Sequence, residues 1–332
     1  MKKGNRLLLV ACCVLLAACS GSTKPGKSAN EPIPLADAPD FNADSAYSYV
    51  EKQCSFGPRV PNTEAHRQCG DWIVEKFASF GAEVREQRAD VTAFDGTILH
   101  IRNVIASYNP NAERRVLVCG HWDSRPWADQ DKTEEKRHVP VLAANDAGSD
   151  VAVMLELARQ ININKVEMGV DFICFDAEDY GAPEWEPSAG DGGWCLGSKH
   201  WSANLHAYGY KALFGILLDM VGGEGTTFAH EGYSLHYAPQ VVEYVWATAA
   251  QIGYEDVFVR EERGYITDDH VAVNETARIP CIDIVAYSSV GSSSFGPTWH
   301  TADDTSAHID RKVLKAAGQT VLQVIYNFDN SE

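Results

Sequence analysis

The stretch GVDFICFDAED, residues 169–179, decides the fold of this 332-residue chain. Its first part, Val170 to Phe175, is short, follows a glycine and is rich in β-branched and aromatic residues, which predicts a strand buried on both faces. Three carboxylates follow at the carboxyl end of this strand: Asp176, Glu178 and Asp179. Ligands bind at that end of the strands in an open α/β sheet, and adjacent carboxylates repel one another unless a cation or a shared proton relieves them. The stretch is therefore predicted to be half of a metal site, with a solvated acidic turn as the plainer alternative.

Composition indicates a globular protein with one large α/β domain or two small ones. Hydrophobic residues make up 45% of the chain and charged residues 22%, which is ordinary for a protein that buries a core. The formal net charge of −18 argues against nucleic acid and anionic membrane surfaces as partners. Because the sequence shows no internal repeat and no second linker, we expect a single domain over residues 44–332.

The amino terminus is predicted to be a targeting segment. Three cations precede an apolar run, Leu7 to Ala18, which is shorter than the roughly 20 residues that span a bilayer. The run closes with LAAC, which resembles the lipobox of bacterial lipoproteins and implies cleavage before Cys19 and lipidation of its thiol. The alternative is an ordinary signal peptide with a chance cysteine. We expect residues 1–18 to be a lipoprotein signal peptide, and the exported protein to face the periplasm or the cell surface with its lipid as the only membrane contact.

The rest of the chain divides into a tether and the domain. Residues 19–43 are rich in Ser, Gly, Pro and Asn and lack an apolar period, which predicts a flexible tether. Beyond it, two helices and a hairpin with an Asp95-Gly96 turn give way to strands that alternate with helices, a pattern typical of parallel βαβ units. The expected elements are a helix from Asp44 or Ser45, a helix over 63–80, hairpin strands over 83–93 and 97–107, strands over 115–119, 170–175, 213–218 and 279–286, and helices over 149–161, 239–252 and 310–328.

Residues able to bind a metal or move a proton follow each main strand. Taken singly, Asp146 could cap the helix that follows it, and Asp219 could end its strand in a turn. Five such coincidences are hard to attribute to capping, because the carboxyl ends of parallel strands meet along one edge of a sheet. Histidine and carboxylate side chains suit Zn²⁺, which usually takes three protein ligands in catalytic sites. The residues concerned are His121 and Asp123, Asp146, Glu178 and Asp179, Asp219, and His300.

These residues lie in motifs that resemble a known family. The motifs are GHWDSRPWAD, AANDAGSD, FDAED, LLDMVG, TDDH and PTWHTADD. Their order and approximate spacing resemble those of glutaminyl-peptide cyclotransferases of the animal type, including their bacterial relatives. The similarity extends from GPRVPN at Gly57 to the final helix. That family shares its fold with zinc-dependent aminopeptidases, which implies a three-layer α/β/α fold with a central mixed, mostly parallel sheet. As a set, the motifs are more specific for this superfamily than for cyclase against peptidase.

The resemblance implies a role for each site residue. It implies zinc-dependent cyclisation of the N-terminal glutamine of peptides and proteins to pyroglutamate, with release of ammonia. Zinc would polarise the glutamine amide, while Glu178 takes a proton from the attacking α-amine and returns it to the leaving ammonia. The implied residues are Asp146, Asp179 and His300 as ligands of one zinc ion, Glu178 as general acid/base, and Asp268 and Asp219 in an acidic network near it.

Aromatic residues are implied to wall the pocket around the glutamine side chain and to exclude water from it. The matching positions are Trp299, Phe295 and Trp185. The loop from Gly181 to Gly193 is longer than in animal members of the family, so Trp194 could serve in place of Trp185.

The sequence departs from the family at two positions of the site. The second acid of the usual glutamate pair is Asp179, which is one methylene shorter, and a lysine of the animal members is replaced by Arg125. Six cysteines follow Cys19, and none of them is spaced as CxxC. Cys54 with Cys69 is the only disulfide pairing that we suggest.

Two other functions stay open. A zinc aminopeptidase with two ions bridged by Asp146 would use five residues that are all present. The tryptophan before His300, the TDDH motif and the aromatic pocket favour the cyclase. The third possibility is a lipoprotein that only binds peptide termini, and an intact Glu178 argues against it, since a binder needs no base. The five residues of the aminopeptidase alternative are His121, Asp146, Asp179, Asp219 and His300.

Overall fold

The computed structural model describes residues 1, 32–186, 193–288 and 293–331. Ile33–Glu332 form one compact unit. The predicted signal peptide and its lipidation site, Cys19, lie outside the described residues. Among the residues that are described, no helix combines the length and apolar character needed to cross a bilayer.

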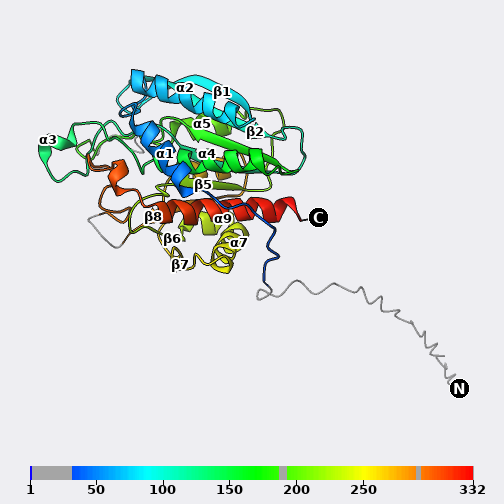
Figure 1. The fold of residues 1–332 in the computed structure, drawn as a ribbon. Helices are drawn as coiled ribbons and strands as arrows, with labels where there is room; N and C mark the ends of the chain where they lie inside the picture. The colour runs from blue at the N-terminus through cyan, green and yellow to red at the C-terminus, as the bar shows by residue number, and fades with distance from the viewer. Residues whose placement is uncertain (2–31, 187–192, 289–292, 332) are drawn as a thin grey trace. The chain divides into compact units, whose positions relative to one another are not determined.

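A mixed eight-stranded sheet forms the centre of the unit (Figure 1), in the order β1-β2-β4-β3-β5-β8-β6-β7. The four central strands β4, β3, β5 and β8 are parallel neighbours, whereas β2 joins β4 and β6 joins β8 in antiparallel register. The predicted α/β class with a mixed, mostly parallel core is thereby confirmed. The strands are β1 (Glu83–Thr92), β2 (Ile98–Tyr108), β3 (Arg115–His121), β4 (Gly169–Phe175), β5 (Gly215–Asp219), β6 (Thr227–His230), β7 (Phe258–Glu262) and β8 (Cys281–Tyr287).

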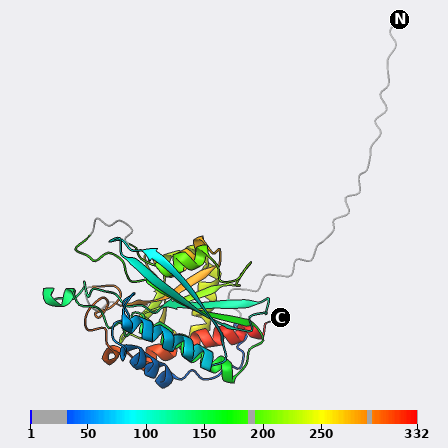
Figure 2. The same ribbon diagram turned by 90° about the horizontal axis from the view of Figure 1, so that it is seen from above.

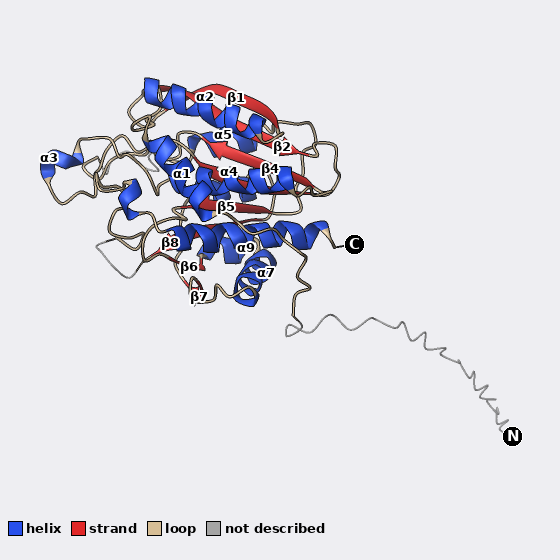
Figure 3. Ribbon diagram, in the orientation of Figure 1, coloured by secondary structure: helices blue, strands red, loops and turns tan. Residues whose placement is uncertain are grey.

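Helices cover both faces of this sheet (Figures 2 and 3). Successive residues of a strand point to opposite faces, so Val116 and Val118 of β3 join one hydrophobic cluster, while Leu117 and Cys119 join another. The first cluster is covered by α1, α2, α4, α7 and α9, and the second by α5 and α8. The helices are α1 (Ala43–Cys54), α2 (Glu64–Ser79), α3 (Glu134–Arg137), α4 (Gly148–Ile163), α5 (Leu196–Ala203), α6 (Gly232–Tyr237), α7 (Pro239–Gln251), α8 (Asp269–Glu275) and α9 (Arg311–Asp329), with a 3-10 turn at Ser306–His308.

The predicted hairpin, the four central strands and the five long helices are all present, with ends displaced by a few residues. The first helix begins at Ala43 rather than at Asp44 or Ser45, because the side chain of Asn42 caps it by accepting a hydrogen bond from the Ser45 backbone N–H at 3.0 Å. The short elements α3, α5, α6, α8, β6 and β7 were not predicted.

The second half of the predicted tether is not flexible but packs on the domain. The ring of Phe41 is 1% exposed and lies against Gly318 of α9, where an added Cβ would come within 2.3 Å of the ring. The Phe41 backbone N–H donates to Gln319 Oε1 at 2.8 Å. We expected the domain to begin at residue 44. The compact unit begins at Ile33 instead.

The suggested pairing of Cys54 with Cys69 is not formed. All six cysteines within the described residues are free thiols. Cys69 is fully buried on α2, where a thiol packs as a small hydrophobic side chain.

Candidate active site

A pocket of about 360 Å³ opens at the carboxyl ends of the central strands. All six residues predicted as metal ligands or catalytic groups line it, together with Phe295 and Trp299. Ligands of open α/β sheets bind at this edge, because loops from several parallel strands converge there.

The fold brings the six residues together from five separate loops. Glu178 and Asp179 follow β4, Asp219 is the last residue of β5, and Asp146 precedes α4. His300 follows β8 in the loop that leads to α9, and Asp268 is the N-cap of α8. The parallel arrangement of β3, β4, β5 and β8 places these loops at one edge of the sheet.

Two buried carboxylates hold the loops that carry these groups. Asp123 accepts hydrogen bonds from the backbone N–H groups of Glu178 and Asp179, at 3.0 and 3.2 Å. Asp304 accepts one from the backbone N–H of Asp146 at 3.1 Å, and burial raises the pKa of Asp304 to about 7. Asp304 was not predicted as a site residue, although it lies in the same PTWHTADD motif as His300.

Asp146, Asp179 and His300 offer three ligand atoms that all lie within 4.8 Å of one another. His300 Nε2 is 3.2 Å from Asp179 Oδ1 and 3.6 Å from Asp146 Oδ2. Burial lowers the pKa of His300 to about 3, so its imidazole is neutral and can donate a lone pair. Burial raises the pKa of Asp179 to about 7, because nothing fully compensates its charge in the protein alone. Two carboxylates with one neutral imidazole fit a zinc ion.

Glu178 faces a different set of partners from those of its neighbour Asp179. Its ligand atoms lie within 4.8 Å of those of Asp268 and Cys195. Burial raises the pKa of Glu178 well above its ordinary value. The charge of His121 lowers this pKa in part, and the charge of Asp268 raises it further. A buried carboxyl with a raised pKa, at the wall of a pocket, is suited to holding and passing a proton. Cys195 was not predicted to belong to the site.

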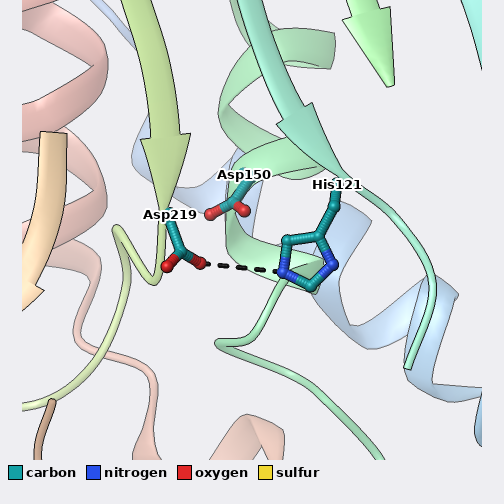
Figure 4. Close-up of side chains that lie close together, drawn as sticks. All are labelled: His121, Asp150 and Asp219. Atoms are coloured by element: carbon teal, nitrogen blue, oxygen red, sulfur yellow. Dashed lines mark ion pairs between the residues drawn. The ribbon is translucent and has the colours of Figure 1, made fainter. Parts of the chain in front are cut away.

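A second group of possible metal ligands lies beside the first (Figure 4). It consists of His121, Asp150 and Asp219, and His121 Nε2 is 3.7 Å from Asp219 Oδ1. Asp146 lies between the groups, since its Oδ1 is 2.9 Å from His121 Nε2 while its Oδ2 faces His300. Asp150 is fully buried, which raises its pKa well above the ordinary value, and its Oδ2 has no hydrogen-bond partner among the described residues. Asp150 has no signal in the sequence beyond its place in the AANDAGSD motif.

The aromatic wall is formed by Trp194, Phe295 and Trp299. The ring of Trp299 stacks on His300 at 3.8 Å between centroids, and the ring of Trp194 lies parallel to His300 at 6.0 Å. The predicted Trp185 lies outside the pocket with 41% of its surface exposed. Trp194 lines the pocket instead, because it precedes Cys195, the N-cap of α5, and the backbone N–H groups of Cys195 and Leu196 are bonded to the acidic loop.

Arg125 is buried beside Asp179 and Trp194. Its guanidinium donates to both oxygens of Asp129, at 2.7 and 2.6 Å, and lies 3.5 Å from Asp179 Oδ1. The same group lies 4.6 Å from the ring centroid of Trp194. A planar guanidinium can make all three contacts at once, which a lysine ammonium cannot.

Comparison with known proteins gives relatives of two kinds. The model of peptidase family M28 matches residues 103–325. The structure of Bacteroides thetaiotaomicron glutaminyl cyclase bound to N-acetylhistamine is 49% identical, with a TM-score of 0.86, and the match covers 89% of this chain and 100% of that one. A leucine aminopeptidase precursor from the same species is also 49% identical, with a TM-score of 0.85 and coverage of 90% and 100%. The glutaminyl-peptide cyclotransferase of Drosophila melanogaster is 25% identical over 276 residues, which are 76% of this chain and 72% of that protein.

Proposed function

The chain belongs to peptidase family M28, and we propose that it is a glutaminyl-peptide cyclotransferase that converts the N-terminal glutamine of peptides and proteins to pyroglutamate. The observation that carries this function is the arrangement of Glu178 beside three zinc-type ligands in an aromatic-walled pocket. The 49% identity to a glutaminyl cyclase over the full length of that protein supports it.

The residues present can account for the reaction. Zinc held by Asp146, Asp179 and His300 would polarise the side-chain amide of the glutamine. Glu178 accepts a proton from the α-amine as the nitrogen attacks the amide carbon, and gives a proton to the nitrogen that leaves as ammonia. One C–N bond forms, one C–N bond breaks, and no water is consumed. Because nucleophile and electrophile belong to one molecule, holding the glutamine in a bent conformation gains the advantage of an intramolecular reaction.

The pocket walls favour cyclisation over hydrolysis. Trp194, Phe295 and Trp299 give the pocket an apolar lining next to the ligands. Side chains of this kind exclude water from the reacting amide, so that the α-amine is the nucleophile that reaches it.

We propose one zinc ion per chain. Each carboxylate oxygen of Asp146 already has its own neighbour, since Oδ1 accepts a hydrogen bond from His121 at 2.9 Å and Oδ2 faces His300 at 3.6 Å. An acid that bridged two ions through both oxygens would have to give up the contact between its Oδ1 and His121. His121 Nε2 lies 2.9 Å from Asp146 Oδ1 and 3.7 Å from Asp219 Oδ1, and Figure 4 shows the second of these contacts.

The aminopeptidase alternative is favoured by one observation, the second ligand group at His121, Asp150 and Asp219, together with the aminopeptidase name of a 49% identical relative.

One assay separates the functions. Purified protein is incubated with a peptide that begins with glutamine and, separately, with one that begins with leucine, and ammonia release and peptide mass are followed. We expect ammonia release without shortening of the chain. Release of free leucine would show that the protein is an aminopeptidase. If neither reaction occurs, the function that remains is peptide binding.

Metal content provides an independent test of the zinc proposal. We expect one equivalent of zinc per chain by atomic absorption after dialysis. Two tightly held equivalents would contradict the role of His121 and favour the bridged pair.

We also propose that the protein is an exported lipoprotein, anchored through Cys19 and facing the periplasm or the cell surface. The support is the sequence of the leader, with its cations, its short apolar run and the LAAC motif. Incorporation of a labelled fatty acid should depend on Cys19. If Cys19→Ala is labelled as strongly as the parent protein, the proposal is wrong.

A further inference from the structure

Cys195 is a buried residue that touches the general acid/base and has no role in the chemistry described above. Its Sγ lies 3.1 Å from Glu178 Oε1, within the range of a hydrogen bond that involves sulfur. The side chain is 98% buried, since only 2% of its surface is exposed. Asp268 completes the group, and its Oδ2 has no hydrogen-bond partner in the described part of the chain.

The backbone around Cys195 is fixed to the loop that carries Glu178. The Cys195 N–H donates to the Glu178 carbonyl at 2.9 Å, and the Leu196 N–H donates to the Ala177 carbonyl at 3.0 Å. Gly197 lies so close to strand β4 that an added Cβ would come within 2.2 Å of the Asp176 carbonyl oxygen. These contacts leave the thiol little freedom, so its position relative to the carboxyl of Glu178 is set by the main chain.

In the structure the thiol is placed as a hydrogen-bond donor toward Glu178 Oε1. Burial and the charges of Glu178 and Asp269 raise the pKa of Cys195 well above its ordinary value, so it keeps its proton. A neutral S–H next to a carboxyl oxygen donates, and hydrogen bonds to an ionised acceptor are stronger than those to a neutral one.

We propose that Cys195 is a positioning residue for the general acid/base: its thiol binds Oε1 of Glu178 and so directs Oε2 toward the substrate nitrogen that gives up and regains the proton. The inference rests on the proposed function for the role of Glu178. The contact itself does not depend on which reaction the site performs.

Two substitutions test the role in the zinc-loaded, full-length protein. Cys195→Ala removes the donor, and alanine is chosen over valine because residue 195 has φ 56°, which a β-branched side chain tolerates poorly. We expect kcat for glutamine cyclisation to fall about tenfold, with KM changed less than about twofold, because the lost bond acts on the base and not on substrate binding. Cys195→Ser keeps a donor and should restore kcat to within about threefold of the parent.

Cys69→Ala is the matched control, since Cys69 is equally buried but lies on α2, away from the pocket. It should leave kcat unchanged. Zinc content and melting temperature are measured for all variants. An unchanged kcat in Cys195→Ala, or a rise in KM alone, would overturn the proposal. So would a serine variant that is no more active than the alanine variant.

Infrared spectroscopy tests the contact without any turnover. The S–H stretching band lies in a region free of other protein absorption and moves to lower frequency when the thiol donates. Subtracting the spectrum of Cys195→Ser isolates this band, and we expect it at lower frequency than that of Cys69. It should shift in Glu178→Gln, where an amide replaces the carboxyl that accepts from the thiol. A band at the frequency of a free thiol would refute the contact, whatever the activity of the variants. If the parent protein does not cyclise glutamine peptides, only the proposed function is refuted.

Discussion

Glu178 and Asp179 are adjacent in sequence, yet the structure gives them different neighbours. Asp179 faces His300 and Arg125, and the positive charge of Arg125 offsets part of the rise in the pKa of Asp179 that burial causes. Glu178 faces Cys195 and Asp268 in a buried environment that favours its protonated form. The separation arises because the chain turns sharply after β4, with Ala177 in the left-handed region at φ 51°, so consecutive side chains leave the turn in different directions.

This division of roles predicts the effect of Glu178→Gln. Glutamine keeps the shape of the side chain but cannot accept the proton of the α-amine. We expect kcat to fall by about 10²–10⁴, with zinc content unchanged, as measured by ammonia release and atomic absorption. Glu113→Gln, at an exposed position, is the control and should behave as the parent protein. Retention of activity in Glu178→Gln would mean that another group is the base.

The corrected aromatic wall gives a second prediction at the residue scale. Trp194→Ala removes a ring that lines the pocket and is parallel to His300, so kcat/KM for a glutamine peptide should fall by about 10–100-fold. Trp185→Ala, at a half-exposed position outside the pocket, should change kcat/KM by less than about twofold. Steady-state kinetics of both variants decide between the two tryptophans. A larger loss in Trp185→Ala would restore the assignment made from sequence.

The site residues that could be predicted from sequence were those that follow strands. Glu178 and Asp179 follow β4 and Asp219 ends β5, so the topology of a parallel sheet was enough to bring them together. Asp146 precedes α4 and was marked by its AANDAGSD motif instead. Cys195 could not be predicted in this way. Its place depends on a short helix and on backbone bonds to a loop 17 residues earlier, and neither leaves a periodic pattern.

At the scale of elements, long amphipathic or apolar segments were predicted well and short buried ones were not. Helix α9 has a stripe of apolar residues over five turns, so its pattern is clear. Helix α8 has only seven residues and buries both Asp269 and His270, so no apolar period marks it. The segment 33–42 has no period either, because it is fixed by hydrogen bonds to α7 and α9.

The packing of segment 33–42 predicts that it contributes to the stability of the domain. Phe41→Ala removes a ring that is 1% exposed and leaves a cavity against α9. We expect the free energy of unfolding to fall by about 3–5 kcal/mol in urea titrations. Ile163→Ala, at a position that is 60% exposed, should cost less than about 0.5 kcal/mol. Equal stability of the Phe41 variant and the parent would show that the segment is detached from the domain in solution.

At the scale of the whole molecule, the fold concentrates buried acids at one edge of its sheet. Burial raises the pKa of Asp179 to about 7 and that of Asp269 to about 8, in each case from an ordinary value of 3.8. Such groups make the folded protein bind more protons than the unfolded chain between about pH 4 and pH 7–8. A bound zinc ion changes this balance, because Asp179 as a ligand is ionised and holds no proton.

Zinc removal should therefore make stability depend more steeply on pH. In the chelated protein, the folded state still holds protons in this pH window that the unfolded chain has already lost. Each such proton lowers the free energy of unfolding by about 1.4 kcal/mol for every pH unit of increase. The zinc-loaded protein lacks the contribution of Asp179, so the difference in melting temperature between the two forms should widen from pH 5 to pH 7. Asp179→Asn, which cannot titrate, should flatten the dependence of the chelated form. Parallel melting curves for the zinc-loaded and chelated proteins across this range would show that Asp179 does not lose a proton when zinc binds, and would remove it from the ligand set.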